Sequence, residues 1–203
     1  MAKAAHHFPA CGTKDVVKIL AAVGRLDRAD QDPVDELGRA LGAHELCRVL
    51  HAMRRWYSFQ TGAMARILLA HRDELVGAMD LDDDAAVGCF RGFKVNAGDP
   101  LASLREGAVT TLPVTRNGGC SSWTAGRELA DRFSGASRGK VGLVVELLHS
   151  PGAQPFIAPP ERTRPWFDAL YQEAIGSSFR FNEREYAVRA DAVQVRIVRV
   201  KRR

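Results

Sequence analysis

The sequence lacks several features that would place it in a special class of protein. It has no apolar run that approaches the eighteen residues of a membrane span, and its first twelve residues, MAKAAHHFPACG, contain no apolar core of a secretory signal. Its four cysteines are scattered, without C-x-x-C spacing. We therefore expect a protein of a reducing compartment, cytoplasmic in its own cell or in a target cell, with no membrane association and no disulfide framework.

The composition is that of an ordinary folded protein. The 203 residues are 46% hydrophobic and 26% charged, which suits one domain or one domain with a helical extension. The charge is uneven. Residues 1–84 carry 11 Lys and Arg against 13 Asp and Glu, whereas residues 85–203 carry 18 against 11, a net +7. A basic C-terminal half favours anionic ligands, but it does not distinguish a dinucleotide from a nucleic acid.

Hydrophobic periodicity divides the chain into a helical part followed by a strand-rich part. Helical spacing predicts helices over residues 14–24, 33–41, 43–59, 63–79 and 124–133. Alternation and β-branched residues predict strands over residues 87–95, 109–114, 141–148, 179–188 and 193–200. Between them, the prolines of residues 151–165 indicate a long surface connection. Helices first and strands later indicate an α+β fold.

The predicted organisation has three parts. Residues 1–12 form a flexible tail, in which we assign no metal to His6, His7 and Cys11. Residues 13–84 form a helical lobe, where Asp32 precedes Pro33 as the expected cap of a short helix. Residues 85–203 form a β-core. The methionines and aromatic residues of the lobe indicate packing, and we expect no metal site.

Two glutamates near the end of the chain form the first candidate site. In a strand from Phe181 to Val188, Glu183 and Glu185 share a face and lie roughly 6.6 Å apart. Such a pair suits a cationic group held beside it. The alternative is an exposed edge strand with solvated glutamates.

Two motifs upstream supply further polar groups. Arg91, in a predicted strand, offers a planar cationic fork suited to phosphate, and Gly92 would let a ligand approach the backbone. Ser122 and Thr124 flank Trp123 at a strand-to-helix junction. Both hydroxyl residues could equally be helix N-caps.

In this order, the motifs resemble the arginine–serine–glutamate class of mono-ADP-ribosyltransferases, which includes clostridial toxins acting on actin and Rho and many phage and bacterial relatives. The family pattern is an arginine, often R-G, then S-T-S or S-W-T before a helix ending A-x-x-F, then E-x-E or Q-x-E. The corresponding residues here are Arg91-Gly92, Ser122-Trp123-Thr124 with Ala130 and Phe133, and Glu183-x-Glu185.

The resemblance covers roughly residues 60 to 200 and departs from the toxin pattern in the central motif. The chain reads S-S-W-T, so Ser121 competes with Ser122 for the serine role. We prefer Ser122, because S-W-T is the commoner variant among the phage and bacterial relatives. Trp56-Tyr57-Ser58 also looks like the family's Y-T/S helix feature.

The resemblance implies an ADP-ribosyltransferase-like fold, with an N-terminal helical lobe and two packed, mainly antiparallel sheets around an NAD cleft. It implies cleavage of NAD, as a substrate, at the nicotinamide–ribose bond. Glu185 would stabilise the positive charge that develops on the ribose, as in glycoside hydrolysis. Glu183 would orient or deprotonate the acceptor, and the E-x-E form implies an arginine of a protein.

The resemblance also implies roles for the remaining residues of the motifs. Arg91 would pair with the pyrophosphate, and Gly92 would expose backbone groups to the nicotinamide amide. Ser122, with Thr124 beside it, would hold the strand geometry and hydrogen-bond the catalytic glutamate. Phe133 would stack on nicotinamide, the alternative being a core position on the inward face of its helix.

Phe179 and Phe181 would belong to the substrate-recognition loop, the alternative being ordinary strand packing. Other functions stay open: transfer of ADP-ribose to RNA or DNA, NAD hydrolysis with water as the acceptor, and a non-catalytic NAD-binding or interaction module. A toxin or effector role and a regulatory or phage role are equally compatible with the motifs.

Overall fold

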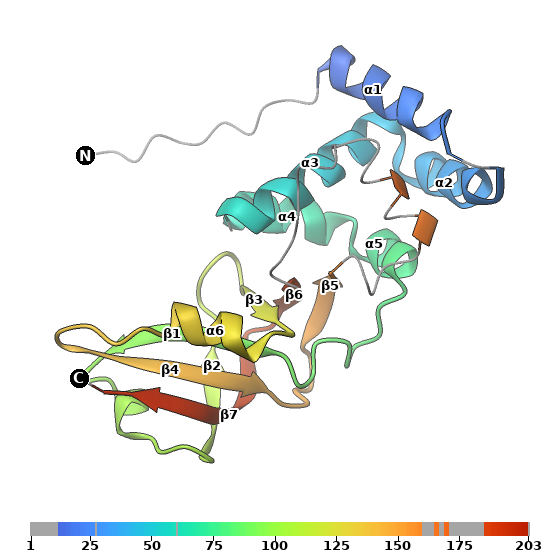
Figure 1. Cartoon of the computed structure of the whole chain (residues 1–203). Coiled ribbons are helices and arrows are strands. Elements are labelled where there is room, and N and C mark those ends of the chain that lie inside the picture. The colour runs from blue at the N-terminus through green and yellow to red at the C-terminus, as the bar shows by residue number, and fades with distance from the viewer. Residues whose placement is uncertain are drawn as a thin grey trace.

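The computed structural model describes residues 12–26, 28–59, 61–159, 165–166, 169–170 and 185–202, and Figure 1 shows their arrangement. Five helices precede the first strand: α1 (Thr13–Val23), α2 (Arg28–Leu41), α3 (Ala43–Phe59), α4 (Gly62–Ala70) and α5 (Arg72–Met79). The strands and the helix α6 follow, so the chain has the predicted α+β character. Among the described residues, no helix combines the length and the apolar character that a membrane crossing needs.

Local sequence signals account for several helix ends. The Thr61 hydroxyl accepts a hydrogen bond from the Met64 backbone N–H at 3.4 Å, which caps α4. The predicted helix over residues 63–79 is wrong in one respect, because it is two helices. At His71 the backbone takes φ −125° and ψ 32°, outside the helical region, and α5 starts at the next residue.

The start of α2 also differs from the prediction. The helix begins at Arg28, so Pro33 lies inside it and Asp32 does not cap it. A proline at this depth removes one backbone hydrogen bond, a loss that the rest of α2 tolerates. Its apolar side chains Val34, Leu37 and Leu41 are buried, and this packing stabilises the helix.

Within the described residues, the β-core contains seven strands: β1 (Phe90–Asn96), β2 (Val109–Pro113), β3 (Cys120–Thr124), β4 (Lys140–Leu147), β5 (Gln154–Ile157), β6 (Glu185–Arg189) and β7 (Ala192–Lys201). They pair antiparallel in the order β2-β7-β4-β1-β3-β6-β5. The prediction of two packed sheets is therefore wrong, since one sheet joins all seven strands.

The join between β1 and β3 explains the difference. β1 pairs with β4 along its whole length, from Phe90 to Asn96, but it meets β3 only at the pair Phe90 and Thr124. The sheet thus has two arms, β2-β7-β4-β1 and β3-β6-β5, which are connected at a single residue pair. Sequence patterns show which residues form strands, but not whether two groups of strands are joined.

The proline-rich stretch is not a surface connection throughout, contrary to the prediction. It contains β5, whose Phe156 and Ile157 are fully buried. Pro155 fits within β5 because this strand lies at the end of the sheet, where a missing N–H need not break a ladder. β5 also places β6 in the interior of its arm, so Glu185 does not lie on an edge strand.

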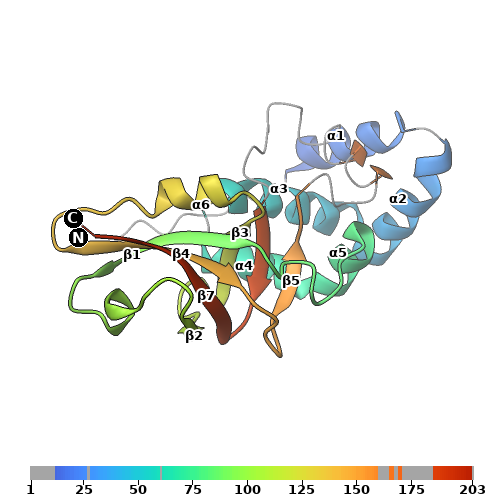
Figure 2. The same cartoon turned by 60° about the horizontal axis from the view of Figure 1, so that its bottom comes forward.

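Helices cover the sheet at two places. α6 (Arg127–Phe133) lies across β1 and β4, as Figure 2 shows, while the helical lobe packs against the β3-β6-β5 arm. The main buried cluster contains Leu50 and Trp56 from the lobe together with Trp123 and Val188 from the sheet. The lobe and this arm therefore share one hydrophobic core.

The cysteines differ in state. Cys47, fully buried on α3, is disulfide-bonded, whereas Cys89 and Cys120 are buried and belong to no disulfide. The scattered cysteines predicted a reducing compartment and no disulfide framework, and the disulfide at Cys47 departs from that expectation. Cysteine spacing alone does not report which residues the fold brings together.

Candidate functional site

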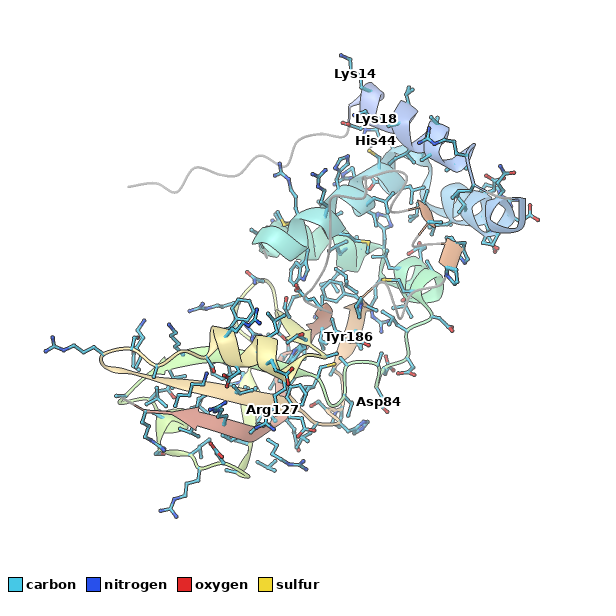
Figure 3. All side chains as sticks on the ribbon, viewed as in Figure 1. Lys14, Lys18, His44, Asp84, Arg127 and Tyr186 are labelled. Carbon is cyan, nitrogen blue, oxygen red and sulfur yellow. The ribbon has the colours of Figure 1, made fainter. Side chains whose placement is uncertain are left out.

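The register between β3 and β6 brings the hydroxyl motif and the glutamate motif together. Thr124 pairs with Glu185, and Ser122 pairs with Ala187. Phe90 of β1 pairs with Thr124 from the other side. Side chains at paired positions share a face of the sheet, so Ser122, Thr124 and Glu185 lie on one face beside the start of β1. Figure 3 labels Tyr186, which follows Glu185, where the sheet meets the helical lobe.

A cavity of about 250 Å³ opens on this face under α6. Its lining includes every candidate residue of the three motifs that the structure describes. These residues are Arg91, Gly92, Ser122, Thr124, Phe133 and Glu185, and the other described residues of the lining are Phe90, Trp123, Leu129 and Ala130. We call this space the first cavity.

Glu185 is buried and held by a residue of the helical lobe. Its side chain is 3% exposed, and Oε1 accepts a hydrogen bond of 3.1 Å from Nε1 of Trp56. Trp56 is itself fully buried and packs edge-to-face on Phe156, with 5.7 Å between the ring centroids. The interpretation of Glu185 as a solvated residue of an exposed edge is wrong. A buried carboxylate is costly unless it is hydrogen-bonded, and Trp56 supplies one such bond.

The two serines of the central motif have different surroundings. The Ser121 hydroxyl accepts a hydrogen bond of 2.9 Å from Nε1 of Trp123 and is directed away from the first cavity. The Ser122 Oγ lies in the lining of the first cavity, is buried, and has no hydrogen-bond partner among the described residues. Ser122 is therefore the serine that faces the candidate site.

The hydrogen bond expected between Ser122 and Glu185 is absent, and this expectation is corrected. Trp56 donates to Glu185 instead, so the glutamate does not depend on the serine. A buried hydroxyl without a partner costs about 1–3 kcal/mol. A ligand that supplies a hydrogen-bond partner in the first cavity would recover that cost.

Thr124 contributes to local geometry as well as to the cavity wall. Its Oγ1 accepts a hydrogen bond of 3.0 Å from the Gly126 backbone N–H. Gly126 is the N-cap of α6, so Thr124 is not the cap residue itself. The contact fixes the turn that leads from β3 into α6.

Arg91 lies in an electrostatically unusual position. Burial lowers the pKa of its guanidinium, the positive charge of Arg116 lowers it further, and Glu185 opposes the shift. Among the described residues, no carboxylate forms an ion pair with Arg91. A partly buried cation without a paired anion provides a favourable place for an anionic ligand.

Gly92 has a packing role that the sequence did not indicate. A Cβ atom at Gly92 would lie 1.7 Å from the carbonyl oxygen of Ala130, so only glycine lets α6 approach β1 this closely. The close contact at Gly92 is therefore with a helix of the same chain, and the approach of a ligand to this glycine stays a prediction. At the end of α6, Phe133 is 54% exposed, so the alternative that it occupies an inward core position is wrong. Its ring is available at the cavity wall.

Three candidate residues, Glu183, Phe179 and Phe181, lie outside the described part of the chain. Sequence reasoning missed the link between Trp56 and Glu185, which are 129 positions apart. The Trp56-Tyr57-Ser58 motif indicates only a helix feature, not a contact with Glu185. Within the described ranges, no group of three His, Cys, Asp or Glu residues could hold a metal ion.

Comparison with known proteins adds no assignment: no protein-family model, no curated protein and no solved structure matches the chain.

Proposed function

We propose that the chain is a mono-ADP-ribosyltransferase with an ADP-ribosyltransferase-like fold, which cleaves NAD and transfers ADP-ribose to a macromolecular acceptor. One observation carries the proposal. Arg91, the unpartnered hydroxyl of Ser122 and the buried, oriented carboxylate of Glu185 line the same cavity. These groups come from three strands and from motifs up to 94 positions apart.

The three groups suit the different parts of an NAD molecule. The pyrophosphate is anionic and matches the guanidinium of Arg91, which has no paired carboxylate among the described residues. The ribose carries hydroxyl groups that could pair with the Ser122 Oγ and with Glu185. The exposed ring of Phe133 offers a surface for the nicotinamide ring.

The proposed reaction breaks the bond between C1′ of the ribose and N1 of nicotinamide. The bonding electron pair leaves with nicotinamide, and positive charge develops on the ribose. A carboxylate fixed beside the sugar stabilises this charge more in the transition state than in the ground state. Trp56 holds the Glu185 carboxylate before the reaction starts, so little reorganisation is needed.

C1′ then bonds to the acceptor, which loses one proton to a base or to solvent. We propose an arginine side chain of a protein as the acceptor and Glu183 as the group that orients or deprotonates it. With water as the acceptor the same site is an NAD glycohydrolase. With a base of RNA or DNA as the acceptor, the basic residues 85–203 would attract the phosphate backbone. Action in the cytoplasm belongs to the same proposal.

Two glutamine substitutions test this function. Glu185→Gln removes the charge but keeps the shape, so it should lower nicotinamide release and ADP-ribose transfer together, by a factor on the order of 10² or more. Glu183→Gln should lower transfer to arginine while leaving most hydrolysis, because water needs no such orientation. Both reactions are measured side by side with labelled NAD, and protease or nuclease treatment then identifies the labelled acceptor.

Circular dichroism of both variants provides the control for folding. No nicotinamide release by the unmodified protein, with or without a cell lysate, would reject the enzyme assignment. Equal and small effects of both substitutions would remove the two glutamates from the mechanism.

A further inference from the structure

The face of the sheet on which α6 lies carries basic side chains from β7. In the register between β4 and β7, Lys201 pairs with Gly142. Gly142 lies directly beneath the end of α6, because a Cβ atom there would lie 1.6 Å from the Ser134 carbonyl oxygen. Paired positions share a face of the sheet, and so do positions two apart along a strand, so Lys201 and Arg199 lie on the face that carries α6.

One carboxylate of α6 holds these two cations. Asp131 forms ion pairs with Lys201 at 2.8 Å and with Arg199 at 3.1 Å. The hydrogen bond from Lys201 lowers the pKa of the Asp131 carboxyl below its ordinary value, so the carboxylate stays charged. Two positive charges thus share one negative charge, and the Arg199 side chain, 53% exposed, still offers N–H groups to an anion.

The two sides of α6 have different environments. Arg127 lies four residues before Asp131 and is therefore on the same side of the helix, the side that meets β7. Leu129 and Phe133, which are also four residues apart, line the first cavity. The body of α6, which Figure 2 shows across the sheet, therefore separates the cations beside β7 from the first cavity.

We define the basic surface by six cations on this side of the sheet and of α6, five of which are exposed. Its members are Arg127 and Arg132 of α6, Lys140 of β4, and Arg196, Arg199 and Lys201 of β7. The four carboxylates beside them are Glu106, Glu128, Asp131 and Glu146, so positive charge is in excess. Within the part of the chain that the structure describes, Arg127, Arg132 and Lys140 form no ion pair.

The strands of the basic surface offer little for an apolar partner. β2, β4 and β7 contain no aromatic residue, and their exposed large hydrophobic residue is Val109, which pairs with Arg196. A site for a membrane surface inserts apolar and aromatic side chains, and a site for single-stranded nucleic acid stacks bases on aromatic rings. The basic surface suits neither partner. The phosphates of a nucleic-acid duplex, by contrast, are contacted by Lys and Arg without any stacking.

The extent of the basic surface fits contact with several phosphates at once. From Arg196 to Lys201 the strand β7 covers roughly 17 Å, a length over which a DNA duplex carries about ten phosphates. Gln194 of β7 and Thr111 of β2 are paired and exposed two positions before Arg196. Their amide and hydroxyl groups extend the surface with further hydrogen-bonding groups for phosphate and sugar.

We propose that the basic surface binds the phosphate backbone of a nucleic-acid duplex without reading its sequence. The inference does not rest on the proposed function, since none of the six cations lines the first cavity. It assigns a docking surface for a partner and not the acceptor of the reaction.

Fluorescence anisotropy tests the proposal with a labelled DNA duplex of about twenty base pairs, and with an RNA duplex and a single strand of the same length. The triple variant Arg127→Gln, Arg132→Gln, Arg196→Gln removes three positive charges but keeps the two cations that pair with Asp131. It should weaken duplex binding about tenfold or more at about 100 mM salt. The slope of log affinity against log salt should become shallower by about 2 to 3, because each phosphate contact contributes about 0.9.

A matched triple variant removes the same charge from the helical lobe. Lys14 and Lys18 of α1 and Arg39 of α2 are exposed, and Figure 3 labels both lysines on the lobe, away from Arg127. The variant Lys14→Gln, Lys18→Gln, Arg39→Gln should bind the duplexes with the affinity and salt dependence of the unmodified chain. Circular dichroism establishes that both triple variants are folded.

The inference fails if the unmodified chain does not bind duplexes at about 50 mM salt, or if both triple variants lose affinity equally. Tighter binding of the single strand than of the duplexes overturns it as well. Vesicles that contain anionic lipid are the last probe: if they, and not the duplexes, lose binding in the surface variant, the partner is a membrane surface and the inference is overturned. Loss for the DNA duplex, the RNA duplex or both supports it and shows which duplex is bound. No NAD is present, so this result is independent of whether the chain cleaves NAD.

Discussion

Trp56 and Glu185 form a contact between a helix of the lobe and a strand of the core. The indole of Trp56 is fully buried, and its N–H donates to Oε1 of the carboxylate. A tryptophan packed in a core has little freedom to move, so it fixes the direction of the carboxylate more firmly than a flexible donor would. At the scale of single residues, Trp56 is thus the positioning residue of the candidate site.

Replacing Trp56 by Phe tests this role. The substitution keeps an aromatic ring beside Phe156 but removes the donor to Glu185, which should cost about 1–3 kcal/mol of stability. If the proposed function holds, we expect kcat for nicotinamide release to fall about tenfold or more while KM for NAD changes little, because Arg91, the proposed phosphate-binding residue, is untouched. A variant that loses stability but keeps its kcat would show that the contact is structural only.

At the scale of secondary-structure elements, α6 forms one wall of the first cavity. It rests on β1 and β4 through two glycines whose hydrogen atoms face the helix backbone. A Cβ at Gly92 would lie 1.7 Å from the Ala130 oxygen, and one at Gly142 would lie 1.6 Å from the Ser134 oxygen. Asp131 of the same helix is paired with Lys201 and Arg199 of β7, at 2.8 and 3.1 Å. These contacts fix both the distance between α6 and the sheet and the direction in which α6 runs across it.

Gly92→Ala should therefore lift α6 and change the first cavity. We expect a loss of stability of about 1–3 kcal/mol from overpacking, together with weaker binding of nicotinamide mononucleotide. Gly77→Ala is the matched control, since Gly77 lies in α5 and a Cβ added there would meet no other atom within 4 Å. It should be neutral or should stabilise the chain by up to about 1 kcal/mol. Urea denaturation and calorimetry distinguish the two variants, and equal effects would contradict this account of α6.

Whole-molecule stability depends on a core that both the lobe and the sheet share. Cys120 belongs to this core, at the start of β3 and opposite Arg189 of β6. Burial raises the pKa of the Cys120 thiol to about 11, although the positive charge of Arg189 opposes the shift. An unfolded cysteine has a pKa of about 8.5, so folding favours the protonated thiol in alkaline solution.

The sign of the resulting pH dependence follows from proton binding. Between about pH 8.5 and pH 11 the unfolded chain loses the Cys120 proton before the folded chain does, so stability falls as the pH rises. Below about pH 8.5 both states keep the proton and the contribution is complete. We expect the difference in unfolding free energy between the unmodified chain and Cys120→Ala to shrink across this range in urea titrations. A difference that stays constant from pH 7 to pH 11 would show that the thiol titrates normally.

Sequence and structure agree best where a pattern is local and strong. The helix Ala43–Phe59 has the predicted bounds, and the predicted strand over residues 109–114 corresponds to β2, which ends one residue earlier. Local patterns did not predict the helix break at His71, because no proline or glycine marks the position where the backbone leaves the helical conformation. They failed at β5 as well, where burial against the lobe outweighs the low strand preference of Pro155.

At the candidate site, too, the sequence predicts the local motifs but not the contacts between distant segments. The short motifs group Arg91, Ser122 and Glu185, and the structure places all three at one cavity, while their function stays a prediction. They could not predict that Trp56 holds Glu185, or that Arg116 stands near Arg91, because these contacts depend on how distant segments pack. Long-range packing has no signature in the spacing of residues along the chain.

The single pair of Phe90 and Thr124 that joins the two arms of the sheet has a consequence for recognition. Among the described strands, β1 pairs only with β4 from Arg91 to Asn96, and β3 pairs only with β6 from Cys120 to Trp123. Within the described part of the chain, each of these two segments therefore has one edge without a partner strand, on the side that faces the other arm of the sheet. Their amide and carbonyl groups belong to the main chain, so a ligand that used them would be recognised by atoms that every substitution except one by proline leaves in place.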